Sequence, residues 1–225
     1  MLFIPICLSR SYTELLQVYG MMDAAFSKED VAGPIGGEGR EATLQHFALR
    51  YGVSSCRIES LVLDPRIAFG NISDDLITSL SSGRMSILDA PCGSGAVGAS
   101  LLSSIAVLRK NVVLPKLPLD IDITGGDFSE TALEIYTKII AKLEPTLNSV
   151  GIGINLKTVS WDATNPDTTA SLVDTWFGNN IAYSEYLAII ANFSGEASKR
   201  FADFERSFEH IHERLYNEIA EKDDF

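Results

Sequence analysis

Hydrophobic residues recur along the chain at two spacings, and these spacings predict helices and strands that alternate. Short apolar runs bounded by turn residues predict strands, whereas apolar residues three or four positions apart predict amphipathic helices. In the second part of the chain, predicted strands alternate with predicted helices, which is typical of an α/β protein with a parallel sheet. The predicted strands are residues 85–88, 119–126, 151–161 and 186–192. The last of them is a continuous apolar run, the pattern of a strand buried on both faces.

The helices predicted between and after these strands have clear boundaries. Residues 96–110 follow a glycine-rich turn, and residues 130–143 have Ser129 as their N-cap and Pro145 as their expected end. A helix over 169–177 comes next. The final helix begins near residue 201, and its apolar stripe is expected to pack on another part of the protein; the stripe consists of Phe201, Phe204, Phe208, Ile211, Leu215 and Ile219.

The first part of the chain is predicted to be mainly helical. Helices are expected over 11–26, over 40–51 with Gly52 as a stop, and over 74–80. Residues 55–63 are predicted to form a strand. We therefore expect an N-terminal helical segment, residues 1–84, and a ligand-binding domain, residues 85–225, which together form one compact unit.

Two further segments of this first part are less regular. The first eight residues are apolar, but they lack a basic region and contain Pro5, so they predict a strand or a buried arm and no signal peptide. Residues 31–39 include four glycines and one proline and must form a loop, which is either a connector or a lid over the site.

The turn after the first of these strands contains the first candidate chemistry. It reads Asp89-Ala90-Pro91-Cys92-Gly93-Ser94-Gly95 and leads directly into a helix. Glycines let the backbone approach a ligand where a β-carbon would collide, and the helix directs free N–H groups toward that ligand. Asp89 lies at the carboxyl end of its strand, where open α/β sheets bind ligands. We expect an adenosine-like ligand here.

Two kinds of nucleotide ligand fit this turn. Residues 93–98 match the G-x-G-x-x-G pattern of dinucleotide sites, so a nicotinamide-dependent (NAD(P)) oxidoreductase is one alternative. However, Ala90, Pro91 and Cys92 separate Asp89 from the first glycine, and two later strands also end in acids, Asp127 and Asp162. Three carboxylates suit a ligand with a cation, a ribose diol and an exocyclic amine better than a pyrophosphate.

Residues 85–195 resemble the cofactor half of a class I S-adenosylmethionine-dependent methyltransferase. Residues 87–95 are similar to the first motif of that family, in a variant with Pro91 where glycine is commoner. Residues 124–129 and 161–163 look like the second and third motifs, and residues 188–194 are similar to the fourth strand. The resemblance covers about half of the chain and implies a Rossmann-like parallel sheet, flanked by helices, with a visible strand order of 3-2-1-4.

The resemblance also implies roles for individual residues. Asp89 would hold the amino group of S-adenosylmethionine, directly or through water, while Asp127 would bind the ribose hydroxyls. The family's pattern implies a cofactor site formed by Asp89, Pro91, Gly93, Gly95, Asp127, Phe128, Asp162 and Ala163. Phe128 would lie against the adenine face, and Asp162 with Ala163 would set the adenine edge. A helix cap or a loop hydrogen bond is the alternative role for each acid.

Catalytic residues are not dictated by this chemistry. The methyl donor is an activated sulfonium, so positioning in a dry pocket can be enough. Asn192 and Tyr183 are the nearest candidates for contacts to the methyl acceptor. The acceptor itself, a small molecule or a protein, leaves no recognisable pattern in the sequence.

The chain departs from the family in one major respect. The sheet of the family has seven strands, and only four are found here in order, which leaves an open edge beside the fourth. The chain is therefore the front part of a longer protein, pairs with another chain or a second copy, or covers the edge with N-terminal strands. A non-catalytic or incomplete methyltransferase-like subunit is the corresponding alternative function.

Composition narrows the possible partners and locations. The formal net charge is −12, with no Lys/Arg run longer than two, which argues against general nucleic-acid binding. The three cysteines are too scattered for a disulfide framework or a zinc site, so we expect a cytoplasmic protein without a structural metal. No apolar run is long enough to suggest a membrane span.

Overall fold

A computed structural model describes residues 4–27, 39–81, 83–178, 183–191 and 201–223 of the 225-residue chain. Its four strands form one parallel sheet in the order β3-β2-β1-β4, which confirms the predicted α/β class and strand order. The strands are β1 (Gly83–Asp89), β2 (Leu119–Asp127), β3 (Ile152–Ser160) and β4 (Glu185–Ile189). The helices are α1 (Ile6–Val18), α2 (Met22–Phe26), α3 (Arg40–Leu63), α4 (Ile72–Ser79), α5 (Ala96–Lys110), α6 (Glu130–Asn148), α7 (Pro166–Phe177) and α9 (Phe201–Asp223).

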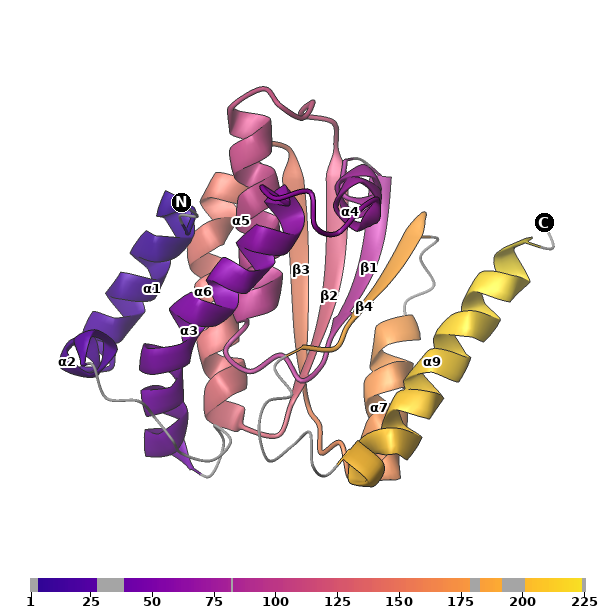
Figure 1. Cartoon of the computed structure of the whole chain (residues 1–225). Coiled ribbons are helices and arrows are strands. Elements are labelled where there is room, and N and C mark those ends of the chain that lie inside the picture. Colours follow the sequence, from indigo (N-terminus) through magenta and orange to yellow (C-terminus); the bar gives the residue numbers. More distant parts are fainter. Residues whose placement is uncertain (1–3, 28–38, 82, 179–182, 192–200, 224–225) are drawn as a thin grey trace.

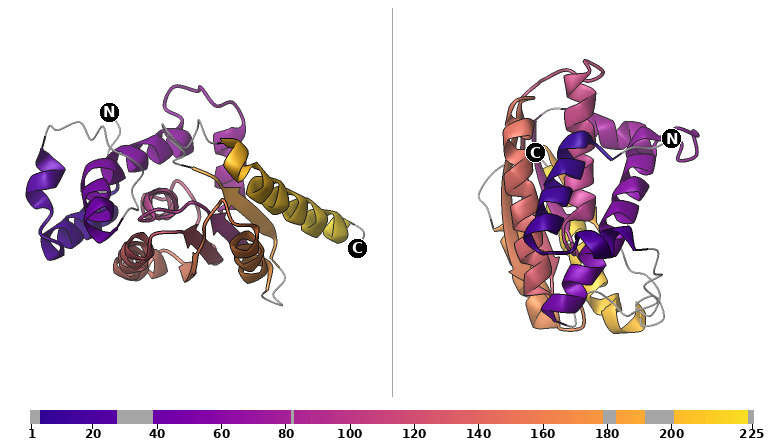
Figure 2. Two further views of the ribbon diagram at one scale, coloured as in Figure 1. Left: turned by 90° about the horizontal axis from the view of Figure 1, so that it is seen from below. Right: turned by 90° about the vertical axis from the view of Figure 1, so that its left-hand side faces the viewer.

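Helices cover both faces of the sheet. Figure 1 shows α5 and α6 on one face and α7 and α9 on the other. The N-terminal helices α1 and α3 lie outside α5 and α6, as the two further views in Figure 2 confirm. The sheet therefore lies between two helical layers, and α1 and α3 form a further layer outside α5 and α6.

The register of the sheet brings the ends of its strands together. Asp89 pairs with Gly125 of β2 on one side and with Ile189 of β4 on the other. Asp127 ends β2 two residues later and pairs with Ser160 of β3. The carboxyl ends of all four strands therefore lie at one edge of the sheet, which is the lower edge in Figure 1.

Two groups of apolar side chains form the core. The larger group joins α1, α3, α5 and α6 to β1, β2 and β3, so the N-terminal helices share a core with the sheet. The smaller group lies on the opposite face and includes Trp161, Leu172, Trp176 and Ile211. Ile211 of α9 is fully buried there, as the apolar stripe of this helix predicted.

The first predicted elements were wrong in detail. The apolar N-terminus is neither a strand nor an arm from Ile6 onward, because α1 begins there, directly after Pro5. Proline fixes φ near the helical value and needs no N–H partner at a helix start. The helix predicted over 11–26 is two helices, and Gly20 separates them with a φ of +67°.

The predicted strand over 55–63 is helical instead. Gly52 does not stop α3, which continues to Leu63. The buried residues Ser55, Glu59 and Val62 recur at spacings of four and three, so they share one face of the helix toward α5. The strand prediction depends on Ile58, Leu61 and Leu63, but the contacts of this segment with α5 favour the helix.

Two other predictions need correction. Pro145 lies inside α6 and does not end it, because the buried Leu147 continues the apolar stripe for another turn. The strand at 186–192 is shorter than predicted, and β4 is half-exposed at four of its five positions, whereas burial on both faces was expected. Within the described residues β4 pairs only with β1, so it is an edge strand. None of the described helices is long and apolar enough to cross a membrane.

Candidate functional site

The turn between β1 and α5 is held against β2 by its backbone. The N–H of Cys92 donates to the carbonyl of Gly126 across 2.9 Å, and the N–H of Gly95 donates to the carbonyl of Cys92 across 2.9 Å. Gly93 and Gly95 have φ values of +51° and +78°, a region that other residues rarely adopt. Glycine at these two positions is therefore required by the shape of the turn itself.

Asp127 joins this turn to the beginning of α6. Its Oδ2 accepts the N–H of Gly93 at 2.9 Å, and its Oδ1 accepts the N–H of Ser129 at 2.9 Å. Ser129 caps α6 as predicted, because its hydroxyl accepts the N–H of Ala132. Burial raises the pKa of Asp127, although the N–H donors of Ser129 and Gly93 act in the opposite direction. Each carboxylate oxygen keeps a further lone pair for another donor.

Asp89 is completely enclosed by protein. Its Oδ2 accepts the Tyr136 hydroxyl at 3.2 Å, and its Oδ1 has no hydrogen-bond partner among the described residues. Burial raises the pKa of Asp89 to about 7, against the Tyr136 hydroxyl and the N–H of Gly98, which favour the charged form. A fully buried acid does not reach a ligand at the surface directly, so its immediate partners are the turn and Tyr136.

Tyr136 is the residue at this site that sequence reasoning missed. In the sequence it belongs to an apolar stripe with Leu133, Ile139, Ile140 and Leu143, and such a stripe indicates only core packing. The signal that could have identified it is the set of small residues opposite, because Gly95, Gly98 and Gly125 leave room for its side chain. Gly95, which was expected to let the backbone approach a ligand, therefore also makes room for a tyrosine.

The remaining predicted cofactor residues surround this centre. Phe128 follows Asp127 and is 47% exposed, so its ring is open to a ligand at the sheet edge. The Oδ1 of Asp162 accepts the N–H and the hydroxyl of Thr164 at 2.9 and 2.7 Å, which is the loop role named as its alternative. The carbonyl of Ala163 accepts the hydroxyl of Ser207, which links this loop to α9. Pro91 is half-buried in the turn.

The two candidates for substrate contacts are not brought to this centre. Tyr183 precedes β4 and is buried at the opposite end of that strand, where its hydroxyl donates to Oδ2 of Asp122 across 2.9 Å. It is therefore a structural hydrogen-bond donor in this position. Asn192 and the glycine-rich stretch 31–38 lie outside the described residues.

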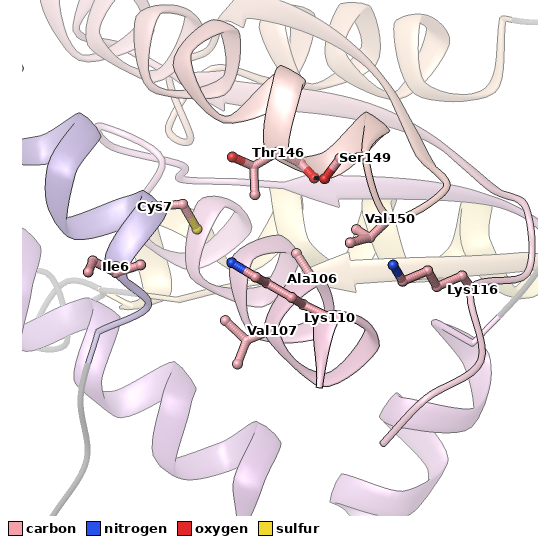
Figure 3. Close-up of a pocket in the computed structure, with 9 residues that line it drawn as sticks. All are labelled: Ile6, Cys7, Ala106, Val107, Lys110, Lys116, Thr146, Ser149 and Val150. Carbon is pink, nitrogen blue, oxygen red and sulfur yellow. Dashed lines mark hydrogen bonds between the residues drawn. The ribbon is translucent and has the colours of Figure 1, made fainter. Parts of the chain in front are cut away.

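A pocket of about 310 Å³ lies far from the glycine turn, between α1 and the ends of α5 and α6 (Figure 3). It is at the amino end of the sheet and takes no part in the candidate site. Its lining is mostly apolar with two lysines; the residues are Ile6, Cys7, Ala106, Val107, Lys110, Lys116, Thr146, Ser149 and Val150. Among the described residues there is also no group of three His, Cys, Asp or Glu side chains able to hold a metal.

Comparisons with known proteins add no family to this description. No family model matches the chain, and no curated protein or solved structure matches it either.

Proposed function

We propose that this protein is an S-adenosylmethionine-dependent methyltransferase that binds its cofactor at the turn between β1 and α5. The observation that carries the proposal is the direct hydrogen bond between the glycine turn, at Gly93, and the buried acid of the next strand, Asp127. In this proposal the glycine turn holds the amino acid of the cofactor and Asp127 holds its ribose, and their hydrogen bond supports a single continuous site. The strand order β3-β2-β1-β4 adds support, because it brings those strand ends to one edge.

The donor and acceptor pattern at Asp127 suits a ribose. The two main-chain N–H groups use one lone pair on each carboxylate oxygen, and the second pairs can accept two adjacent hydroxyls. The half-exposed ring of Phe128 offers an apolar face to an adenine base. In this proposal Asp162 and Ala163 set the adenine edge, as the resemblance implies.

Methyl transfer requires little from the protein beyond the orientation of cofactor and acceptor. S-adenosylmethionine supplies, when bound, a methyl group on a positively charged sulfur. The residues of this chain hold the cofactor, and Asp89 in its ionised form contributes negative charge from beneath the turn without direct contact with the methyl group. We propose a small-molecule or protein acceptor and a cytoplasmic location, and we assign no catalytic base.

Calorimetric titration with S-adenosylmethionine tests the proposal. Wild-type protein should bind it, and Phe128→Ala should weaken binding about threefold to tenfold through the loss of one aromatic contact. Phe69→Ala is a matched control, since Phe69 is 39% exposed and lies outside the site. Reduced nicotinamide cofactor serves as the competing ligand. No binding of S-adenosylmethionine, or tighter binding of the nicotinamide cofactor, contradicts the proposal.

A second function is favoured by the edge of the sheet. The half-exposed β4 has one strand neighbour in the described part of the chain, so a further strand from another chain could pair with it. The protein would then be an incomplete methyltransferase-like subunit. Light scattering on the purified protein gives its oligomeric state, and an activity assay gives its turnover of cofactor. A monomer that turns over cofactor excludes the second function.

A further inference from the structure

Tyr136 extends from the second turn of α6 into the space under the glycine turn. The side chain is fully buried, and its hydroxyl donates to Oδ2 of Asp89 across 3.2 Å. It thus joins α6, which follows β2, to the last residue of β1. No other described side chain donates a hydrogen bond to the Asp89 carboxylate.

Three glycines make room for this side chain. A β-carbon at Gly95 would overlap the Tyr136 ring, and a β-carbon at Gly98 would overlap its hydroxyl. At Gly125 of β2 a β-carbon would lie 3.1 Å from the ring, which is tighter than most real contacts. The ring is therefore enclosed by the turn, the first turn of α5 and the end of β2, all of which must keep their positions while it remains there.

The titratable groups around Tyr136 come from several elements. Asp89 and Cys92 lie on the β1 side, and their charges add to burial in raising the pKa of Tyr136 well above its usual value. Tyr51 of α3 contributes in the same way, and its own hydroxyl has no hydrogen-bond partner among the described residues. Asp127 at the end of β2 raises the pKa of Asp89 in turn. Among the described side chains, the Tyr136 hydroxyl is the one donor that stabilises the charged form of Asp89.

We infer that Tyr136 is a positioning residue, whose ring fixes the turn at residues 92–98 and whose hydroxyl holds the Asp89 carboxylate in the arrangement that receives the cofactor. The cofactor part of this inference rests on the proposed function. The part that concerns Asp89 does not, because it follows from the contacts of Tyr136 alone. Tyr136 touches neither substrate nor cofactor in this account and acts only through the turn and Asp89.

Tyr136→Phe isolates the hydroxyl, because the ring and its packing against the glycines are retained. Loss of the donor should raise the pKa of Asp89, so its carboxylate becomes protonated at higher pH than in the wild type. S-adenosylmethionine carries positive charge, so its affinity should fall as Asp89 is protonated. We expect that fall to occur at higher pH in the variant, with binding about fivefold to tenfold weaker near pH 7.

Two measurements test this inference. A carbon-13 NMR titration of the Asp89 carboxyl carbon follows its protonation without any ligand, and calorimetry from pH 5.5 to 9 follows the affinity for S-adenosylmethionine. Tyr183→Phe is the matched control, because it removes another buried tyrosine hydroxyl that donates to an aspartate, Asp122, away from the site. The expected result is that Tyr136→Phe shifts both profiles to higher pH and Tyr183→Phe shifts neither.

The outcomes separate this inference from the proposed function. An unchanged Asp89 titration in Tyr136→Phe overturns the inference, as does a loss of affinity by the same factor at every pH. If the Asp89 titration shifts but wild-type protein binds no S-adenosylmethionine at any pH, the proposed function fails while the hold of Tyr136 on Asp89 is supported.

Discussion

The main-chain N–H of Gly93 donates to Oδ2 of Asp127 across 2.9 Å, although the two residues lie 34 positions apart. This bond ties the turn after β1 to the end of β2, and the second oxygen of Asp127 ties both to the start of α6. Because buried N–H groups need acceptors, neither strand end can move without breaking this arrangement. The candidate site is thus preformed by contacts within the protein.

Asp127→Asn should therefore destabilise the protein. An amide offers one acceptor oxygen where the carboxylate offers two, which leaves either Gly93 or Ser129 without a partner, at a cost of about 1–3 kcal/mol. Urea unfolding monitored by circular dichroism measures the change. The control Asp120→Asn affects an exposed residue on the same strand, 3.8 Å from Arg84, and should change the free energy of unfolding by less than about 0.5 kcal/mol. Equal effects of both substitutions would contradict this account.

Gly95→Ala should be more harmful than Gly93→Ala. Both glycines have positive φ, so each substitution costs about 1–2 kcal/mol of backbone strain. At Gly95 the new methyl group also overlaps the Tyr136 ring, whereas at Gly93 it meets nothing within 4 Å. We expect about 1–3 kcal/mol of additional destabilisation at Gly95. Combination of Gly95→Ala with Tyr136→Leu should recover part of that excess in unfolding experiments, and strictly additive effects would argue against the overlap.

Stability should fall as the pH rises through the range in which Asp89 titrates. The folded protein holds the Asp89 proton up to about pH 7, while the unfolded chain releases it near the ordinary aspartate pKa of 3.8. The raised pKa thus contributes stability that is fully present below about pH 3.8 and is lost as the pH rises to about 7. The contribution amounts to at most about 4 kcal/mol. Urea unfolding from pH 4.5 to 8 should show this slope in the wild type and a flatter one in Asp89→Asn; identical slopes would refute the assignment.

The anchoring of α9 gives a separate prediction. Ile211 is 1% exposed and packs in the core group with Trp161 and Leu172, so Ile211→Ala should cost about 2–5 kcal/mol. Tyr216 lies on the same helix and is 66% exposed, so Tyr216→Ala should have little effect. Thermal unfolding compares the two variants. A negligible effect of Ile211→Ala would show that α9 is not held against the sheet layer in solution.

The strands that carry the site could be predicted because their signal is local. β1, β2 and β3 are apolar runs or alternations followed by turn residues. β1 and β2 end at an aspartate, β3 ends at Ser160 just before Trp161, and the sheet places those ends together. The extents of α3 and α6 were harder to predict, because Gly52 and Pro145 are helix breakers in isolation. In the folded protein the packing of Val62 and Leu147 outweighs those local preferences.

Contacts within the site depended on side-chain packing that spacing does not encode. The glycines at 95, 98 and 125 are visible in the sequence, but only the fold shows that they lie opposite Tyr136. The loop role of Asp162 depends on hydrogen bonds from Thr164, two positions later, to its Oδ1. Tyr183 looked close to the site because it precedes β4, but the sheet places the start of that strand at the other end.

The central claim is that S-adenosylmethionine binds at the glycine turn, and an amide NMR titration of the labelled protein tests it most directly. We predict concentration-dependent shifts at Gly93, Gly95 and Phe128, with no shift at Val107 and Lys110 of the remote pocket. The claim is contradicted if the cofactor leaves the spectrum unchanged, or if it shifts the remote pocket and not the turn.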